Sequence, residues 1–439
     1  MFYTTEAMLA IMNELPPALA GRSAVVFGGG LLVLLFAQGT IYLASGLRAA
    51  WYDRGERKLA RRRLELAIKA AKLQCEELEQ RKLSWNGYRK FVVCKKVKEC
   101  EDVYSFYLKP HDGRPLPPFK PGQYLTFQLN IPGSAKPLVR CYSISDSHKP
   151  DVYRVTIKRA TPPPDCPGAP EGLASSHFCE RVNEGDILDA KAPTGGFFLD
   201  TTHNRPVVLI SGGVGITPML CMLNAIMESG AQREVWFFFG ARNRAEHIQK
   251  EYLEKIARER DNLRLHICYS RPGAEDVQGK DYLHAERVSV EVFKRVLPSN
   301  NFDFFICGPG AMMKSITDGL KEWGVPDKNI FFEAFGPATV KKAAAPASAN
   351  TTAAPIKVTF SKSGKVVQWN PESDSLLDFA TANGVQIEAG CRAGNCGTCT
   401  IAIKAGSVEF LADHHGAQME QGSCLSCICR PKSDVVLDA

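Results

Sequence analysis

Four cysteines near the C-terminus constrain this chain more than any other feature. Four residues separate Cys391 from Cys396, two separate Cys396 from Cys399, and Cys427 follows after twenty-seven more. This C-x4-C-x2-C…C spacing is one of the recognised ligand sets of a [2Fe–2S] cluster, which needs four thiolates. The pattern therefore predicts a small iron–sulfur module that exchanges electrons one at a time.

A zinc site and a disulfide knot are the alternative interpretations of these cysteines. Zinc sites usually show two separated C-x2-C pairs, whereas the first interval here contains four residues. Gly390, Gly394 and Gly397 also surround the ligands, and glycine allows loop conformations in which backbone N–H groups turn toward cluster sulfurs. The glycines and the spacing together favour the cluster.

Length and charge limit the remaining possibilities. A chain of 439 residues is too long for one compact core, so two or three domains are expected. The formal charge of +7 comes largely from residues 48–63, where seven basic residues face two acidic ones. The remainder is close to neutral, so nucleic acid is not an expected partner.

Most of the fifteen cysteines are scattered, which fits a reducing compartment.

Residues 24–47 contain no charged side chain. As a helix they would measure about 36 Å, enough to cross the hydrocarbon core of a membrane. A cleaved signal peptide is the alternative, but signal peptides carry positive charge before a shorter apolar run. Because the basic excess follows the span, we expect a single-pass protein of the inner (cytoplasmic) membrane, with residues 1–23 on the non-cytoplasmic side and the later domains in the cytoplasm.

Residues 48–84 are expected to form a basic, membrane-proximal helix. Leu59, Leu66 and Leu73 are spaced by seven, which is compatible with a short coiled coil. The intermediate positions are not apolar, so a solvated spacer is favoured, and its Lys and Arg side chains could contact anionic lipid.

The rest of the chain divides by its hydrophobic pattern. Residues 85–200 contain short runs such as YRKFVVCKKV and QYLTFQL broken by Pro and Gly, which predicts an antiparallel β-barrel. Residues 201–336 alternate strand-like runs (PVVLISGG, EVWFFFG, FDFFICGP) with helical ones (PMLCMLNAIMES, AEHIQKEYLEKIARE), which indicates an α/β domain with a parallel sheet. An Ala/Pro-rich tether at 337–355 precedes the cysteine-containing module at 356–439.

The junction SGGVGITPM carries chemistry of its own. Gly212, Gly213 and Gly215 follow an apolar strand and open a helix, where glycine lets the backbone approach a pyrophosphate and the helix N-terminus favours its charge. The sequence is not G-x-G-x-x-G, so a purely structural turn is the alternative.

Six motifs in order give this pattern a family resemblance. The segments RCYS, GLASS, PTGGFFLD, GGVGITP, CGPG and FEAFGP resemble the ferredoxin–NADP reductase superfamily. More narrowly, they resemble flavin reductases that serve oxygenases and carry a C-terminal plant-type ferredoxin, and the reductase half of flavohaemoglobins. The resemblance covers residues 88–336 and 356–439. It implies an FAD-binding barrel, an NAD(P)-binding domain and an α+β, β-grasp ferredoxin domain.

The resemblance also implies flavin-binding residues. Arg140 would pair with a flavin phosphate, Tyr142 would pack along the isoalloxazine, and Ser143 would hydrogen-bond near N5. Gly172 and Ser175 would meet the pyrophosphate. The strand residues Val155, Ile157 and Lys158 would supply backbone contacts. The alternatives are an ordinary strand with an exposed Arg140 and a solvated Lys158.

On the nicotinamide side, Cys307, Gly308 and Pro309 match a C-G-P turn whose thiol lies near the nicotinamide C4. Thr217 would line the hydride-transfer pocket, and Phe335 would cover the flavin face. Cys307 could equally be a small hydrophobic core residue, and Phe335 could be an ordinary core aromatic. The expected catalytic set is Tyr142, Ser143, Thr217, Cys307, Glu333 and Phe335.

Two features depart from the family pattern. The segment 160–171 is long and rich in proline, which affects the adenine side of the flavin site. Cys424 and Cys429 flank Cys427. The family form L-x-C-x-x-x-P selects Cys427, between Leu425 and Pro431, so the flanking pair is predicted to be unligated.

These observations predict an enzyme that transfers electrons from NAD(P)H through flavin and cluster to a protein partner. FAD is favoured over FMN, because the GLASS segment would contact a pyrophosphate, which FMN lacks. NADH is favoured over NADPH, although Arg242, Arg244 and Arg271 stand at predicted strand ends, where basic groups can bind the 2′-phosphate of NADPH.

The expected acceptor is a membrane-associated oxygenase, hydroxylase or desaturase. The alternatives are a respiratory NADH dehydrogenase that reduces quinone and an electron-carrying or redox-sensing module without turnover.

Overall fold

The computed structural model describes residues 17–132, 137–162, 167–168, 171–335, 356–394, 397–411 and 419–439. The chain divides into two units, Met1–Cys75 and Glu76–Ala439. The predicted tether at 337–355, most of the predicted N-terminal segment and the predicted ligand Cys396 lie outside the described residues.

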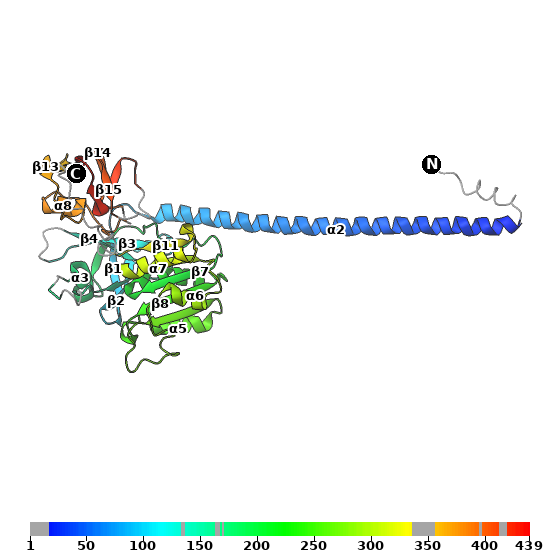
Figure 1. The fold of residues 1–439 in the computed structure, drawn as a ribbon, viewed down its shortest axis with the longest axis horizontal. Helices are drawn as coiled ribbons and strands as arrows, with labels where there is room; N and C mark the ends of the chain where they lie inside the picture. The colour runs from blue at the N-terminus through cyan, green and yellow to red at the C-terminus, as the bar shows by residue number, and fades with distance from the viewer. Residues whose placement is uncertain are drawn as a thin grey trace. The chain divides into compact units, whose positions relative to one another are not determined.

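The N-terminal element is one uninterrupted helix, α2 (Pro17–Leu83), of 67 residues (Figure 1). It joins the predicted apolar and basic helices, because the Ala, Leu, Lys, Arg and Glu that dominate its second half are strong helix formers. Its stretch Gly28–Arg48 has a mean hydropathy of 1.7 and is not buried. By length and composition this stretch fits a membrane span, and an N-terminal signal sequence would fit the same description.

The first domain contains a six-stranded sheet in the order β4-β3-β6-β1-β2-β5, and all the pairings between its strands are antiparallel. Large side chains such as Phe91, Phe106 and Phe127 form its core with Phe178 of the neighbouring helix α3. The edge strands meet at one isolated bridge between Ile144 and Val155. The antiparallel sheet is confirmed, and its closure into a barrel stays a prediction. Its elements are β1 (Arg89–Cys100), β2 (Val103–Pro110), β3 (Tyr124–Leu129), β4 (Leu138–Ser143), β5 (Tyr153–Lys158), α3 (Leu173–Arg181) and β6 (Ile187–Ala190).

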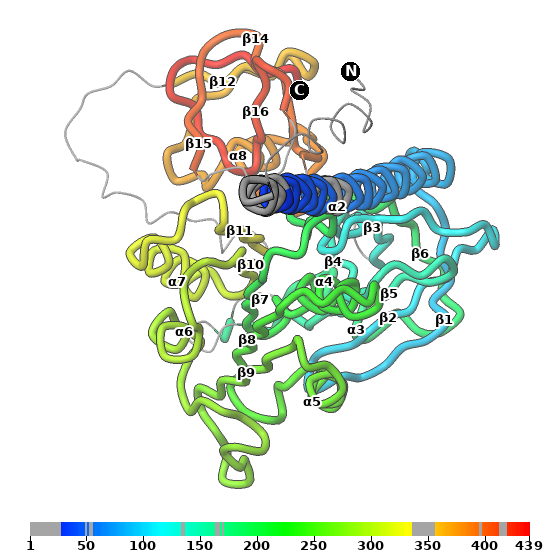
Figure 2. The backbone as a smooth tube through the Cα atoms, turned by 90° about the vertical axis from the view of Figure 1, so that its right-hand side faces the viewer, coloured from blue at the N-terminus to red at the C-terminus, as the bar shows by residue number. Residues whose placement is uncertain are grey.

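The second domain has a five-stranded sheet in the order β11-β10-β7-β8-β9, and every pairing in it is parallel. Figure 2 shows α4 and α5 on one face of this sheet and α6 and α7 on the other. Successive strand residues enter opposite cores, as Leu209 and Ile210 do, which explains the continuous apolar runs in the sequence. The elements are β7 (Val207–Gly212), η1 (Gly213–Gly215), α4 (Ile216–Glu228), β8 (Val235–Ala241), η2 (Arg244–Glu246), α5 (Lys250–Glu259), β9 (Leu263–Tyr269), α6 (Val290–Val296), β10 (Asp303–Cys307), α7 (Gly310–Glu322), η3 (Asp327–Asn329) and β11 (Ile330–Glu333).

One helix of this domain is shorter than its sequence pattern predicts. The helical run starting at Ala245 becomes the short turn η2, and α5 begins only at Lys250. The Asn243 side chain accepts a hydrogen bond from the Ala245 N–H, and Gln249 then adopts a φ of 56°. These two local features end the first turn and start the helix again.

The C-terminal module combines a mixed five-stranded sheet, in the order β13-β12-β18-β14-β16, with a two-stranded sheet of β15 and β17. Leu376, Phe379 and Ala380 of helix α8 pack into its core against Val358 and Phe360. This α+β arrangement agrees with the prediction for residues 356–439. Its elements are β12 (Lys357–Phe360), β13 (Lys365–Gln368), α8 (Leu376–Ala382), β14 (Thr400–Ala405), β15 (Val408–Phe410), β16 (Ser423–Leu425), η5 (Ser426–Ile428), β17 (Cys429–Pro431) and β18 (Val435–Leu437).

Candidate flavin and iron–sulfur site

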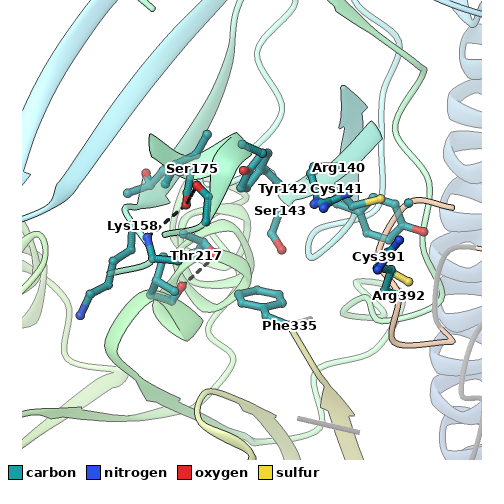
Figure 3. Close-up of a pocket in the computed structure, with 18 of the residues that line it drawn as sticks. Arg140, Cys141, Tyr142, Ser143, Lys158, Ser175, Thr217, Phe335, Cys391 and Arg392 are labelled. Atoms are coloured by element: carbon teal, nitrogen blue, oxygen red, sulfur yellow. Dashed lines mark hydrogen bonds between the residues drawn. The ribbon is translucent and has the colours of Figure 1, made fainter. Parts of the chain in front are cut away.

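A cavity of about 390 Å³ brings together motifs that are far apart in the sequence. Its walls come from β4, β5, the start of α3, the η1–α4 turn, the end of β11 and the loop that carries the first cluster cysteine (Figure 3). The predicted residues that line it are Arg140, Tyr142, Ser143, Ile157, Lys158, Gly172, Ser175, Thr217, Glu333, Phe335 and Cys391.

The end of β4 supplies one wall of the cavity. The Arg140 Nη1 donates to the carbonyl of Val139 at 2.7 Å. Burial lowers the pKa of the Arg140 guanidinium, and the positive charge of Arg392 lowers it further. The ring of Tyr142 meets that of Phe178 edge to face, with 5.2 Å between centroids. Burial raises the pKa of the Tyr142 phenol.

The two arginines fit an anionic group such as a flavin phosphate. The Nε of Arg392 is buried and has no hydrogen-bond partner among the residues that the structure describes. Its Nη1 lies 3.3 Å from Oδ1 of Asp378, which neutralises part of its charge. Two guanidinium groups on one cavity favour a bound anion, since each donates several N–H groups in a fixed geometry.

The G-x-x-S turn packs so closely that only glycine fits its first position. A Cβ on Gly172 would lie 2.7 Å from the Ser175 Oγ and 2.8 Å from the Cβ of Ala160. The Ser175 hydroxyl donates to the Gly172 carbonyl at 2.9 Å and accepts from the Ala160 N–H at 3.1 Å. Val155 and Ile157 of β5 are both buried in the domain core, but only Ile157 also lines the cavity.

The glycine turn after β7 and the C-G-P turn after β10 pack backbone to backbone. A Cβ on Gly215 would clash with the carbonyl of Cys307 and lie 2.7 Å from the nitrogen of Gly308. A Cβ on Gly212 would lie 3.1 Å from the ring of Pro309. Gly213 has a φ of +53° and no atom near the position of a Cβ. These turn residues hold each other in place and do not line the cavity described above.

Cys307 and Glu333 pair across neighbouring parallel strands, and both are buried. The Ser143 Oγ donates to Oε2 of Glu333 at 3.4 Å. Burial raises the pKa of Glu333 to about 8, against the opposing effect of that hydrogen bond. Burial, together with the charge of Glu333, raises the pKa of the Cys307 thiol. The predicted catalytic residues Ser143, Cys307 and Glu333 therefore form one buried group, whose carboxyl is protonated at neutral pH.

Two further predicted residues border the same space. The Thr217 Oγ1 donates to the carbonyl of Val214 at 3.1 Å, and both residues line the cavity (Figure 3). Phe335, just beyond β11, also lines it and packs against the apolar core of the second domain.

Two of the described cluster cysteines lie side by side. The sulfur atoms of Cys399 and Cys427 are 3.1 Å apart, whereas no group of three or more potential metal ligands is gathered among the residues that the structure describes. The N–H of Ala393 points to the Cys391 sulfur at 3.4 Å. Gly394 has a φ of +78°, and a Cβ there would lie 2.5 Å from Ile428. The tight glycine loop and the N–H···S contact fit a thiolate-bound cluster.

Sequence reasoning missed several residues that line the cavity, among them Tyr124, Cys141 and Arg392. Arg392 is the most informative of them because it belongs to the cluster loop and has a φ of 56°, which is uncommon for arginine. The available signal was its position directly after the first ligand, but nothing in the sequence joins that loop to the Arg140 strand.

Comparisons with known families agree with this division of the chain. Residues 90–199 match the oxidoreductase FAD-binding domain, residues 209–318 the oxidoreductase NAD-binding domain, and residues 358–432 the 2Fe-2S iron–sulfur cluster binding domain. The matched domains define an NAD(P)H-dependent flavin iron–sulfur oxidoreductase. Its cofactors are FAD, NAD(H) and a [2Fe–2S] cluster.

The chain belongs to the ferredoxin–NADP reductase superfamily, with a C-terminal 2Fe-2S domain. It is 39% identical over 275 residues to a flavohemoprotein of Halalkalibacterium halodurans, which covers 62% of this chain and 66% of that protein. The match to this curated relative thus spans just under two thirds of the relative's length.

Two solved structures are also similar. The flavohem-like FAD/NAD-binding domain of nitric oxide dioxygenase from Vibrio cholerae is 32% identical, with a TM-score of 0.50, and the match covers 57% of this chain and all of that one. Phthalate dioxygenase reductase, described as modular for electron transfer from pyridine nucleotides to [2Fe-2S], is 25% identical, with a TM-score of 0.51. That match covers 80% of this chain and 98% of the reductase.

Proposed function

We propose that this protein is a membrane-anchored, NADH-dependent reductase that passes electrons through FAD and its [2Fe–2S] cluster to an oxygenase or hydroxylase component. One observation carries the proposal: Cys391 and Arg392 of the cluster loop line the same cavity as Arg140, Tyr142 and Ser143. A flavin in that cavity would lie beside a cluster ligand, which suits direct electron transfer.

Residues of the cavity and the predicted cluster ligands have separate tasks in this proposal. Arg140 and Arg392 bind the flavin phosphates, Gly172 and Ser175 shape the turn beside them, and Tyr142 packs along the ring. Ser143 and Glu333 hold a proton next to the site of hydride transfer, and Phe335 shields that site from water. Bound FAD supplies the exchange between a hydride pair and single electrons. Cys391, Cys396, Cys399 and Cys427 hold the cluster.

The preference for NADH is supported by the partners of two arginines. NADPH sites usually offer a free arginine to the 2′-phosphate. Here Arg242 forms an ion pair with Glu246, and the Arg244 Nη1 lies 3.7 Å from Oδ1 of Asp281. These carboxylates compete with a phosphate for both arginines. The substitution E246Q should therefore improve NADPH use relative to NADH, measured as the ratio of the two kcat/KM values.

The membrane anchor and the acceptor rest on separate observations. The uncharged stretch at 24–47 supports a single span, with the basic residues after it on the cytoplasmic side. Phthalate dioxygenase reductase, by its name, serves a dioxygenase, and its likeness extends over 80% of this chain. An oxygenase or hydroxylase at the membrane is therefore the acceptor that we propose.

Anaerobic rapid mixing with NADH tests the electron route. We expect the flavin absorbance to bleach within milliseconds and the cluster absorbance to follow, with no partner present. An unbleached flavin would instead indicate an electron-carrying or sensing module without turnover.

The acceptor is tested on the purified, reduced protein. Rapid reduction of a soluble quinone by the protein alone would favour the respiratory alternative. Capture of an oxygenase component from detergent-solubilised membranes, together with NADH-dependent substrate oxidation by the reconstituted pair, would support the proposed partner. The same pair without NADH, and the pair with a C427S reductase, serve as controls.

A further inference from the structure

One face of helix α4 contacts the first domain along the length of the helix. Residues at intervals of three and four positions share a helix face, and on α4 they are Thr217, Cys221, Asn224 and Glu228. Thr217 lines the cavity, and Cys221 packs into the apolar core of the first domain. Asn224 and Glu228 form hydrogen bonds with the loop after β4. This face of α4 therefore joins the second domain to the first.

A buried chain of hydrogen bonds lies at the middle of this contact. The Tyr252 hydroxyl of α5 donates to Oδ1 of Asn224 at 2.6 Å, and Nδ2 of Asn224 donates to Oδ1 of Asp146 at 2.6 Å. An ionised carboxylate only accepts hydrogen bonds, so Asp146 fixes the orientation of the amide. Asn224 is 2% exposed, so a broken bond would leave a buried polar group without a partner.

Asp146 is itself held by the first domain. Its Oδ1 also accepts from the Ser147 N–H at 2.9 Å, and its Oδ2 lies 3.8 Å from Nη1 of the buried Arg154. The Arg154 Nε donates to the Ser145 Oγ at 3.2 Å. Asp146 stands three positions after Ser143, which lines the cavity. The hydrogen-bond chain thus runs from α5 through α4 to the strand end that forms one wall of the cavity.

A second contact, at the last turn of α4, is exposed. Oε2 of Glu228 accepts from the Ser147 Oγ at 2.7 Å and from the Lys149 Nζ at 2.6 Å. The side chains of Lys149 and Glu228 are 36% and 47% exposed. Exposed ion pairs contribute little to stability because water and salt screen them. The Lys149–Glu228 pair therefore offers a comparison with the buried chain between the same two elements.

We propose that Asp146, Asn224 and Tyr252 are positioning residues for hydride transfer, a role that rests on the proposed passage of electrons from NADH to FAD. Their hydrogen bonds lock α4 against the loop after β4. This lock fixes Thr217 of the second domain and Ser143 of the first as walls of one cavity. None of the three positioning residues lines that cavity, so each domain should bind its own coenzyme without them. Alignment between the domains is what they supply, and a misplacement of about 1 Å can cost on the order of a hundredfold in rate.

Reversal of the central hydrogen bond tests the proposal. In N224D two carboxylates face each other, so the bond between α4 and the loop is lost. In D146N/N224D the new amide can donate to the new carboxylate, which still accepts from Tyr252. We expect the limiting rate of flavin reduction, measured by anaerobic rapid mixing with NADH, to fall about 10- to 100-fold in N224D and to recover in the double variant. Y252F, which lacks only the hydroxyl, should be slowed by a smaller factor.

Binding and exchange measurements separate alignment from a loss of folding. The dissociation constants for NADH, and for FAD added to the apoprotein, should stay within about twofold of the wild type, because the substitutions lie outside the cavity. Hydrogen exchange of the FAD-free protein needs no turnover. We expect the amides of 145–149 and 216–228 to exchange faster in N224D and to regain wild-type protection in D146N/N224D.

E228Q is the matched control. It keeps an acceptor for Ser147 and removes only the charge that faces Lys149, so its reduction rate should stay within about twofold of the wild type. Wild-type rate and exchange in N224D would overturn the positioning role. An E228Q variant as slow as N224D, or N224D protein that also loses FAD, would overturn it as well. A wild type whose flavin NADH does not reduce would overturn the proposed function, and the exchange data would still show whether the chain locks the two domains.

Discussion

Glu333 keeps its proton at neutral pH because it is buried between the sheet and the cavity, where an ionised carboxylate would lose its hydration. Its pKa of about 8 compares with an ordinary value of 4.5. Between these values the unfolded chain releases the proton and the folded chain retains it. Folding stability therefore falls as pH rises through this window, by at most about 1.4 kcal/mol per pH unit.

The substitution E333Q tests this consequence. Glutamine has the shape of the protonated acid and does not titrate, so the variant should lose the fall in stability between about pH 4.5 and pH 8. Chemical unfolding at several pH values measures the slope. The exposed Glu322→Gln serves as the control and should keep the wild-type slope. A wild-type slope in E333Q would show that Glu333 ionises normally in the folded protein.

Arg140 and Arg392, which both line the cavity, give a second prediction for single residues. If Arg140 and Arg392 both bind the flavin phosphates, R140Q and R392Q should each weaken FAD binding by roughly tenfold or more, since hydrogen bonds to charged groups contribute about 1.5–3 kcal/mol. Flavin fluorescence titration of the apoprotein measures the dissociation constant. The exposed R181Q is the control and should bind FAD as the wild type does. Unchanged binding in R392Q would remove the cluster loop from the flavin site.

Residues within short motifs could be predicted from the sequence, whereas residues joined only by folding could not. The R-x-Y-S and G-x-x-S motifs identified Arg140, Tyr142, Ser143 and Ser175 as candidates, and all of them line the cavity. Arg392 stands 252 positions after Arg140, and only the folded arrangement brings both to one cavity. Which strand residues reach the cavity also needed the structure, because Val155 and Ile157 lie in the same core and only Ile157 lines the cavity.

At the scale of elements, the two glycine turns act as one unit. Alanine at Gly215 would place a methyl group against the backbone of Cys307 and Gly308, which cannot move as a flexible side chain would. Overpacking of this kind costs about 1–3 kcal/mol. We expect G215A to lower the free energy of unfolding by this amount and to raise the KM for NADH.

The neighbouring Gly213 provides the matched control. It has a positive φ but open space around the position of a Cβ, so G213A adds backbone strain of about 1–2 kcal/mol without a clash. Both variants are compared by chemical unfolding and NADH-dependent ferricyanide reduction. If the KM for NADH rises more in G213A than in G215A, the close contact between the two turns does not position the coenzyme.

Strand elements were the most predictable level of the fold. Short alternating runs predicted the antiparallel sheet, because a strand buried on one face alternates apolar and polar residues. Continuous apolar runs predicted the parallel sheet, because its strands are buried on both faces. The start of α5 was wrong, since the apolar spacing continues through Ala245–Gln249 although a capped turn and a φ of 56° at Gln249 interrupt the helix there. Strand order and pairing between sheets depend on long-range contacts that no local pattern records.

At the scale of the whole molecule, the proposed membrane anchoring rests on the apolar stretch of α2. Its large side chains are exposed, among them Leu34 at 66% and Phe36 at 78%. Exposed apolar surface of this extent needs a partner, and a bilayer would provide one along the whole stretch. A chain without residues 1–47 should therefore be soluble, reduce ferricyanide with NADH as fast as the full chain, and lose activity with a membrane-bound acceptor.

Charge placed within the stretch tests the bilayer more directly than truncation does. A lysine at the centre of a membrane span costs about 2.5–3.5 kcal/mol on insertion scales, whereas the same change on a solvated helix costs little. We expect L34K to shift protein from the carbonate-washed membrane fraction to the supernatant. L66K, at a similarly exposed leucine (60%) beyond the span, should stay with the membrane. If wild-type protein is found in the supernatant with a shortened N-terminus, the stretch is a signal sequence and the anchoring proposal fails.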